Sequence, residues 1–286
     1  MDQNCKIGIF DSGFGGLTIF KHIKELLPEY DYVYLGDSAR TPYGHRSFEA
    51  VLKFTMEGVD FLFEQGCRLI IVACNTASAR ALRSIQQQWL TTKYQDYPFL
   101  RVLGVIRPTV ESLGGLGQSK TALLWATMGT VKSDSFLLEA SHHAPDIHLI
   151  QLACPLLVPL IEAGELSGDG VAYFVKKYWQ ESVSRERGEL IDVLLLACTH
   201  YPLLLPEIRK VVPDRVKIVT QGEIVAGSLK DYLQRHPEME KRLSRANRVQ
   251  YYTTDRCDHF DHLAKIFMSD NDIISELAII DRFAHN

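Results

Sequence analysis

The sequence of 286 residues contains no run that approaches the roughly 20 consecutive apolar residues needed for a membrane-spanning helix. We also expect no secretory signal peptide, because the apolar segment at residues 5–10 is short and leads directly into Asp11. Both observations argue against the membrane and secretory classes. We therefore expect a cytoplasmic protein whose cysteine thiols remain reduced.

Metal-binding cysteine patterns and blocks of basic charge are absent as well. The six cysteines form no CxxC pair, which argues against a structural zinc site and a disulfide framework, and we expect no metal. The 31 basic residues are balanced by 35 acidic ones, which leaves a net charge of −4. Nucleic acids and membrane surfaces attract concentrated positive charge, so we expect a small-molecule partner instead.

What the sequence does contain is a regular alternation of strand and helix patterns. Apolar runs predict strands at residues 7–10, 32–35, 69–73, 100–106, 122–126, 147–152, 193–197, 216–219 and 249–253. Helical periodicity predicts helices at residues 16–27, 47–65, 77–89, 133–141, 156–163, 170–184, 203–212, 223–235 and 259–267. Such alternation is typical of an α/β fold with mostly parallel sheets flanked by helices.

The alternating pattern occurs twice along the chain, which we interpret as an internal duplication of one α/β unit. The repeat is domain-sized, so it predicts two similar domains related by a pseudo-twofold axis, with the active site in the cleft between them. We expect residues 1–100 and 217–286 to form the first domain, and residues 101–216 to form the second.

Two cysteines occupy closely similar positions in the two halves. Cys74 follows one apolar run in the sequence Ala-Cys-Asn-Thr, and Cys198 follows another in Ala-Cys-Thr-His. Parallel α/β sheets place their chemistry just beyond the carboxyl ends of the strands. The sequence therefore predicts one site with a matched pair of thiols, one on each side of a substrate.

Two opposed thiols suit a reaction that removes a proton from one face of a carbon atom and returns a proton to the other face. One thiolate acts as the base, the opposite thiol acts as the acid, and the reverse reaction exchanges their roles. An ordinary thiol has a pKa of about 8.5, so the thiolate is accessible near neutral pH. A Cys–His hydrolase needs only one thiol and leaves the second unexplained.

Polar residues next to these cysteines are candidate substrate ligands and proton carriers. Asn75 and Thr76 follow the first cysteine, and Thr199 and His200 follow the second. Their donors could hold a carboxylate and stabilise a carbanion, and His200 could also carry a proton or favour the thiolate. No lysine lies in a context typical of pyridoxal chemistry, so we expect no cofactor.

Two loops at the same predicted sheet edge supply further candidates. DSGFGG at residues 11–16 permits a tight turn at a helix N-terminus, which favours an anion; its spacing is not GxGxxG and does not indicate dinucleotide binding. In TPYG at residues 41–44, a backbone N–H or the Tyr43 hydroxyl could hold a carboxylate. Asp11 could hydrogen-bond or accept a proton near Cys74.

The remaining cysteines are interpreted as structural. Cys5, Cys67 and Cys257 fit the usual behaviour of cysteine as a small buried apolar side chain. Cys154 also follows an alanine at a predicted strand end. Because Pro155 removes a backbone N–H there and no polar pair follows, Cys154 is assigned a structural role as well.

Four segments together resemble the aspartate/glutamate racemase family, and glutamate racemases within it, over nearly the whole chain. They are FDSGFGGL at residues 10–17, TPYG at residues 41–44, ACNTAS at residues 73–78 and CTHYPL at residues 198–203. The resemblance implies interconversion of L- and D-glutamate without pyridoxal phosphate, which supplies D-glutamate for bacterial peptidoglycan. We expect such an enzyme to act as a homodimer.

The family pattern implies a role for each matching residue of this sequence. Cys74 would deprotonate D-glutamate and Cys198 would deprotonate L-glutamate, with assistance from Asp11 and His200. The implied substrate-binding positions are Asp11, Ser12, Pro42, Tyr43, Gly44, Asn75, Thr76, Thr127, Thr130, Glu162, Thr199 and His200.

Three positions depart from the commoner family pattern. Arg107 stands where many relatives have Glu, Thr220-Gln221 replaces Asp-Ser, and Ala197 replaces the Gly before the second cysteine. None of them is a proton-transfer residue. Arg107 could alter the charge at a domain or subunit edge.

Three alternatives stay open at this point. An aspartate-specific racemase would differ in the shape of its pocket, which the sequence does not give. An amino-acid-binding regulator could use the scaffold without turnover, although retention of both thiols argues against it. A single-thiol hydrolase or decarboxylase on a related fold is disfavoured by the second cysteine.

Overall fold

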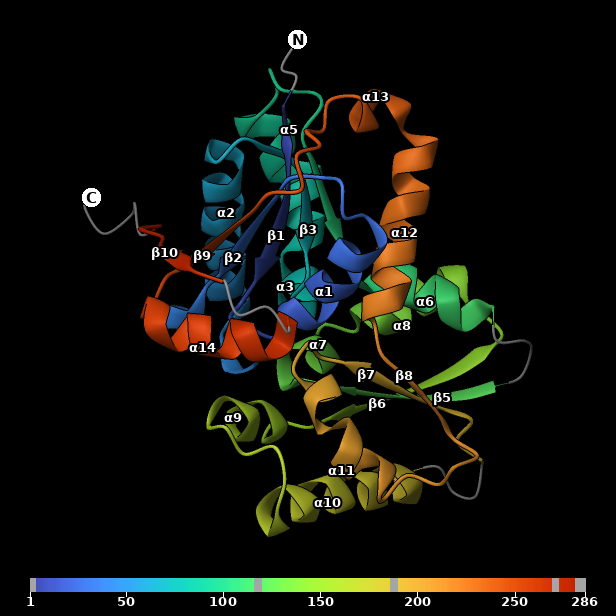
Figure 1. The fold of residues 1–286 in the computed structure, drawn as a ribbon. Helices are drawn as coiled ribbons and strands as arrows, with labels where there is room; N and C mark the ends of the chain where they lie inside the picture. The colour runs from blue at the N-terminus through green and yellow to red at the C-terminus, as the bar shows by residue number, and fades with distance from the viewer. Residues whose placement is uncertain (1–3, 116–119, 186–189, 269–272, 281–286) are drawn as a thin grey trace.

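The computed structural model describes residues 4–115, 120–185, 190–268 and 273–280, which form two sheets flanked by helices (Figure 1). The larger sheet contains β1 (Lys6–Asp11), β2 (Tyr32–Gly36), β3 (Cys67–Val72), β4 (Arg101–Gly104), β9 (Val249–Thr253) and β10 (Ser275–Leu277). The smaller sheet contains β5 (Lys120–Ala126), β6 (Ile147–Ala153), β7 (Val193–Ala197) and β8 (Lys217–Val219). The expected α/β class with two parallel sheets is confirmed.

The order of the strands repeats between the two sheets. Every pairing between described strands is parallel. The larger sheet has the order β10-β9-β2-β1-β3-β4, and the smaller has the order β6-β5-β7-β8. The run β2-β1-β3-β4 thus corresponds to β6-β5-β7-β8, as an internal duplication requires. In this correspondence Cys74 and Cys198 follow equivalent strands, β3 and β7.

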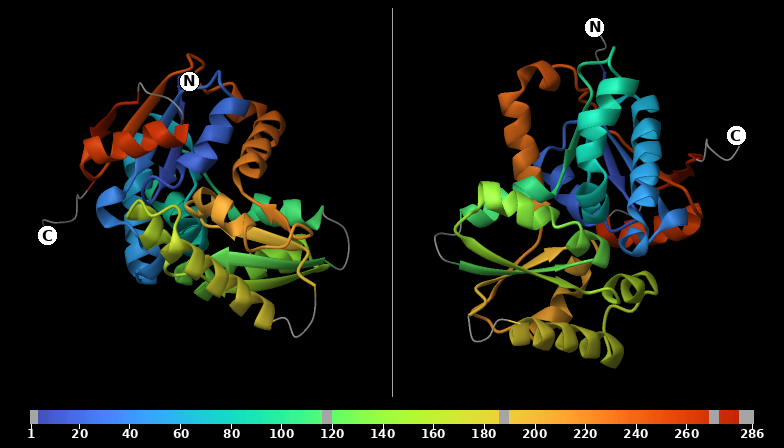
Figure 2. Two further views of the ribbon diagram at one scale, coloured as in Figure 1. Left: turned by 60° about the horizontal axis from the view of Figure 1, so that its bottom comes forward. Right: turned by 180° about the vertical axis from the view of Figure 1, so that it is seen from behind.

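Helices cover both faces of each sheet (Figure 2). One face of the larger sheet packs against α1 (Leu17–Leu26), α12 (Gly222–Arg235) and α14 (Cys257–Met268), and the other against α2 (Phe48–Glu64), α3 (Asn75–Arg80), α4 (Leu82–Ser84) and α5 (Leu90–Lys93). The smaller sheet lies between α6 (Ile106–Gly114) and α8 (Ser135–His143) on one face and α9 (Leu157–Glu162), α10 (Asp169–Arg185) and α11 (Leu205–Arg209) on the other. Shorter elements are η1 (Ser38–Arg40), η2 (Tyr43–His45), the π-helical η3 (Ile85–Trp89), α7 (Met128–Lys132), η4 (Tyr201–Leu204) and α13 (Pro237–Glu240). Within the described ranges, no helix has the combined length and apolar character that crossing a membrane demands.

Alternation of side chains along the buried strands explains these layers, because successive residues point to opposite faces. Ile7 and Ile9 of β1 lie in the core under α1, whereas Phe10 lies in the core under α2. In β5, Trp125 packs on the side of α10 and Leu124 on the side of α6. Strands buried on both faces read as continuous apolar runs, which is why the sequence identifies them.

Two strands lie in the opposite sheet from the one that the expected domain boundaries imply. β4 pairs with β3 in the larger sheet, and β8 pairs with β7 in the smaller one. The predicted strand at residues 100–106 ends at Gly104, because Ile106 already begins α6 and packs on the smaller sheet. We therefore propose that the chain crosses between the two units near residue 105 and near residue 220.

Close packing between α2 and β1 sets a strict limit on side-chain size. Gly58 of α2 packs against Phe10, which is fully buried and immediately precedes Asp11. A Cβ atom at position 58 would lie 2.3 Å from Cε2 of Phe10, far inside van der Waals contact. Glycine at this position therefore lets the helix approach the strand.

We predict that Gly58→Ala destabilises the fold by about 1–2 kcal/mol, because overpacking outweighs the gain of about 1 kcal/mol in helix propensity. Gly227→Ala on α12 is the control, since a Cβ atom there meets nothing within 4 Å. The control should stabilise the protein by up to about 1 kcal/mol. Urea denaturation measures both changes, and equal effects would contradict the packing argument.

Candidate active site

Six strand ends meet around one narrow cavity between the two sheets. Because parallel strands end at a common edge, the segments after β1, β2 and β3 meet those after β5, β6 and β7. The cavity is lined by Ser12, Thr41, Pro42, Tyr43, Gly44, His45, Cys74, Asn75, Thr76, Thr127, Cys154, Pro155, Val158, Cys198, Thr199 and His200. Its volume is about 20 Å³, which is room for about one water molecule.

Cys74 lies at the N-terminus of α3, where it is almost completely buried. Its Sγ accepts a long hydrogen bond from the backbone N–H of Ala77 at 3.5 Å and donates to Oγ of Ser12 at 3.4 Å. Burial, and after it the charge of Asp11, raises the pKa of Cys74 to about 12. Cys74 is therefore a protonated thiol near neutral pH and can supply a proton.

Cys198 has a different charged neighbour, because His200 lies beside it. Nδ1 of His200 is 4.0 Å from Sγ of Cys198, and Nε2 is 3.3 Å from Oε1 of Glu162, at an angle outside hydrogen-bond geometry. Burial alone would lower the pKa of His200, but its contacts with Cys198 and Glu162 outweigh burial and raise the pKa to about 10. An imidazolium at this position stabilises negative charge on the sulfur of Cys198.

Asp11 is fully buried at the end of β1 and joins the two sides of the site. Its Oδ2 accepts a hydrogen bond from the backbone N–H of Gly13 at 3.0 Å, and its Oδ1 accepts one from Oγ1 of Thr199 at 3.4 Å. Burial raises the pKa of Asp11, and the charge of His200 opposes this effect. Asp11 is not itself part of the cavity wall, but its hydrogen bond positions Thr199, which is.

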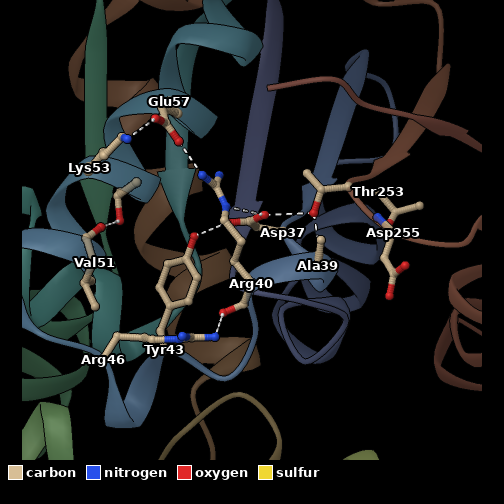
Figure 3. Close-up of polar contacts among 12 residues, drawn as sticks. Asp37, Ala39, Arg40, Tyr43, Arg46, Val51, Lys53, Glu57, Thr253 and Asp255 are labelled. Carbon is tan, nitrogen blue, oxygen red and sulfur yellow. Dashed lines mark hydrogen bonds and ion pairs between the residues drawn. The ribbon is translucent and has the colours of Figure 1, made fainter. Parts of the chain in front are cut away.

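Tyr43 lines the cavity, but its hydroxyl belongs to a buried polar network behind the wall (Figure 3). The hydroxyl donates to Oδ2 of Asp37, which also accepts from Nε of Arg40 at 2.7 Å, and Nη1 of Arg40 contacts Glu57 of α2. Burial, and next the charge of Asp37, raises the pKa of Tyr43, so the hydroxyl stays a donor. The sequence leaves two candidate groups in the loop at residues 41–44 for binding a carboxylate, a backbone N–H and the Tyr43 hydroxyl. Because the hydroxyl is engaged by Asp37, the backbone N–H groups remain.

Three threonine hydroxyls from the two halves of the chain form one hydrogen-bonded cluster. Oγ1 of Thr76 lies 2.9 Å from Oγ1 of Thr127 and 3.4 Å from Oγ1 of Thr130. Thr127 also caps the N-terminus of α7, because its hydroxyl accepts from the backbone N–H of Thr130 at 3.3 Å. Thr130 is fully buried behind the other two, so it positions their hydroxyls.

The structure brings all of the predicted site residues into one region. All except Asp11, Thr130 and Glu162 line the cavity. Each of these three contacts residues of the wall. Asp11 contacts Thr199, Thr130 contacts Thr76 and Thr127, and Glu162 contacts His200.

Five residues of the wall are missing from the sequence prediction: Thr41, His45, Cys154, Pro155 and Val158. Thr41 begins the TPYG segment and donates to Oε1 of Glu162 at 2.9 Å, so the segment itself was the signal. Cys154 follows the end of β6, and that position at the carboxyl end of a parallel strand is the signal that places it in the wall.

Comparison of the sequence with known proteins gives a consistent result. No family model matches the chain. Glutamate racemase of Aquifex aeolicus is 35% identical over 265 residues, which cover 93% of this chain and 94% of that protein. Glutamate racemase of Shouchella clausii is 35% identical over 92% of this chain and 90% of that protein.

Solved structures are similar over the same extent. Glutamate racemase of Francisella tularensis in complex with D-glutamate has a TM-score of 0.83 and 31% identity, and covers 98% of this chain and 99% of that chain. Glutamate racemase isoform RacE1 of Bacillus anthracis has a TM-score of 0.81 and 29% identity over 97% of this chain and 98% of that chain. With its fold, its cavity and both of its strand-end cysteines described, the chain therefore belongs to the glutamate racemase family.

Proposed function

We propose that this protein is a cofactor-independent glutamate racemase in which Cys74 and Cys198 exchange the α-proton of glutamate. The observation that carries the proposal is the pair of buried thiols that follow equivalent strands and line one cavity. Membership of the glutamate racemase family supports the reaction and the substrate. The charged neighbours of the two thiols support the mechanism.

From L- to D-glutamate, the thiolate of Cys198 removes the α-proton, and the electron pair of the broken bond remains on Cα and its carboxylate. The thiol of Cys74 then gives its proton to the opposite face of Cα, and the reverse direction begins with Cys74 as the thiolate. The raised pKa of Cys74 suits it as the acid, and the imidazolium of His200 stabilises the thiolate of Cys198. The proton that leaves Cα thus ends on Cys198, and the proton that replaces it comes from Cys74.

Hydrogen bonds would hold the substrate, because none of the described residues that line the cavity is lysine or arginine. We assign hydrogen bonding of the substrate to Ser12, Tyr43, Gly44, Asn75, Thr76, Thr127, Thr199 and His200, and a van der Waals contact to Pro42, which has no N–H. Fixed donors of this kind also stabilise the negative charge that develops as the α-proton leaves. Asp11, through Thr199, and Glu162, through His200, would keep these groups in place.

We further infer that the D-glutamate serves peptidoglycan synthesis in the cytoplasm and that the protein acts as a homodimer, as its family resemblance implies. Expression of the chain should restore growth of a bacterium that requires D-glutamate. Sedimentation equilibrium should give twice the mass of the 32.4 kDa chain. Absence of growth, or a monomeric mass at all concentrations, would contradict the corresponding part of this inference.

We predict that Cys74→Ser and Cys198→Ser each lower the racemisation rate about a thousandfold or more, because a hydroxyl does not ionise near neutral pH and cannot replace the thiolate base. The reaction is followed in deuterium oxide by circular dichroism and by loss of the α-proton NMR signal of L-glutamate. Cys257→Ser, at the start of α14, is the matched control and should stay within about twofold of the wild type.

Three outcomes of this assay would change the assignment. A near wild-type rate in either variant would disprove the two-thiol mechanism. Racemisation of aspartate without racemisation of glutamate would identify an aspartate-specific racemase. Binding of glutamate without deuterium exchange in the wild type would identify a binding protein rather than an enzyme.

Alkaline pH should weaken the fold through Cys74. Folding raises the pKa of this thiol to about 12, so above about pH 9 the unfolded chain releases a proton that the folded protein retains. This contribution to stability is complete below pH 9 and is lost as the pH rises toward 12. At about pH 10.5 the loss amounts to about 2 kcal/mol.

Urea denaturation of the wild type and of Cys74→Ser between about pH 8 and pH 10.5 measures this contribution. The wild type should lose about 2 kcal/mol more than the variant over this range, because serine has no proton to release. Equal losses in both proteins would mean that the Cys74 thiol ionises normally in the folded state.

A further inference from the structure

Gln221 lies where the chain leaves the smaller sheet, and the mechanism described above gives it no role. It is 3% exposed, follows β8 and directly precedes α12. It is also one of the positions at which the sequence departs from the commoner family pattern. A buried amide at such a position requires partners for its polar atoms.

The side chain of Gln221 is paired with that of Asn75 and also contacts Thr109. Nδ2 of Asn75 donates to Oε1 of Gln221 at 2.6 Å, and Nε2 of Gln221 donates to Oδ1 of Asn75 at 3.1 Å. Nε2 of Gln221 also donates to Oγ1 of Thr109 at 2.9 Å. All three side chains are almost fully buried, so water does not compete for these hydrogen bonds.

The direction of these hydrogen bonds follows from the chemistry of the groups. The hydroxyl of Thr109 donates to the backbone carbonyl of Val105 at 2.6 Å, and a carbonyl can only accept. The oxygen of Thr109 must then accept from Gln221, which turns Nε2 toward Thr109 and Oε1 toward Asn75. Nδ2 of Asn75 must in turn face that oxygen, so the amide of Asn75 has one permitted orientation.

This orientation leaves Asn75 with one donor to spare. Its Nδ2 carries two hydrogens, of which Gln221 takes one. In the part of the chain that the structure describes, the side chain of Asn75 makes no hydrogen bond other than those to Gln221, and Asn75 lines the cavity. The second N–H is therefore available to a carboxylate, whereas a reversed amide would present an oxygen and repel it.

The same hydrogen bonds connect the two places where the chain passes between the sheets. Thr109 lies on α6, which follows β4, and Gln221 precedes α12, which follows β8. β4 and β8 are equivalent strands in the repeated order of the two sheets. The orientation of Asn75 on α3 therefore depends on both crossing segments.

We propose that Gln221 is a positioning residue that fixes the amide of Asn75 with its spare N–H available to a carboxylate of the substrate. This inference rests on the proposed function, in which Asn75 binds glutamate. Gln221 acts through Asn75 and touches neither the α-proton nor the thiols. Its removal should therefore weaken substrate binding and leave proton transfer nearly unchanged.

The test begins with Gln221→Met, which keeps the length of the side chain and removes both polar atoms. KM for L- and D-glutamate should rise about five- to tenfold, and kcat should change less than about twofold. Gln86→Met is the matched control, because Nε2 of Gln86 also donates to a backbone carbonyl, that of Val102, at 2.7 Å, and Gln86 is not part of the cavity wall. Its KM should be that of the wild type.

A double-mutant cycle with Asn75→Ala shows whether Gln221 acts through Asn75. In the Asn75→Ala background, Gln221→Met should change KM by less than about twofold. The side-chain amide NMR signals of Asn75, identified by their absence in Asn75→Ala, provide a readout without substrate. Hydrogen exchange at this amide should be slow in the wild type and in Gln86→Met, and fast in Gln221→Met.

Any of three results would overturn the inference. These are a rise in KM that is equally large in the wild-type and Asn75→Ala backgrounds, a fall in kcat at unchanged KM, and unchanged hydrogen exchange at the Asn75 amide in Gln221→Met. Failure of the proposed function itself would appear differently, as a wild type that does not exchange the α-proton of glutamate.

If Gln221→Met does not fold, Thr109→Val removes only the hydroxyl that orients Gln221. KM should then rise about two- to threefold, and only when Asn75 is present.

Discussion

Parallel strand pairing is the constraint on which the site depends. Within each sheet it brings every strand to its end at the same edge, and the two edges face each other across the cavity. Reversal of β3, which has six residues, would move Cys74 to the opposite edge of its sheet, roughly 20 Å away. Neither thiol could then face the other, whatever the surrounding side chains. The chemistry therefore follows from the topology before any individual hydrogen bond is considered.

The backbone settings of the two cysteines are equivalent, but their charged neighbours differ. The charge of Asp11 helps to keep the proton on Cys74, and the imidazolium of His200 stabilises a thiolate at Cys198. L- and D-glutamate have equal free energies in water, so kcat/KM must be the same in both directions at every pH. The asymmetry thus cannot favour one product. It bears only on the two thiols of the empty enzyme: burial, and after it the charge of Asp11, keeps the proton on Cys74.

The sequence predicts what depends on local pattern and misses what depends on distant partners. The strands before Cys74 and Cys198 are continuous apolar runs, so their place at a sheet edge follows directly from the sequence. The sheet to which β4 and β8 belong does not follow, because apolar residues continue from β4 into α6 and β8 has only three residues. β10 is also three residues long and largely exposed, so it has no recognisable pattern. The pairing of Gln221 with Asn75 joins positions 146 residues apart, which no local signal can reveal.

The small cavity and the two crossing segments together suggest how substrate is admitted. The cavity has room for about one water molecule, and we expect its two walls to separate when glutamate enters. Through its described strands the chain passes between the sheets twice, after β4 and after β8, and a rotation of one unit against the other must bend at those segments. Thr109 and Gln221 join the two segments to each other and to Asn75, so we expect this cluster to lie near the axis of such a rotation. In such a rotation the amide of Asn75 would keep its orientation while the wall that carries Cys198 moves, and we expect closure to bring the Cys198 thiol to a substrate that Asn75 already holds.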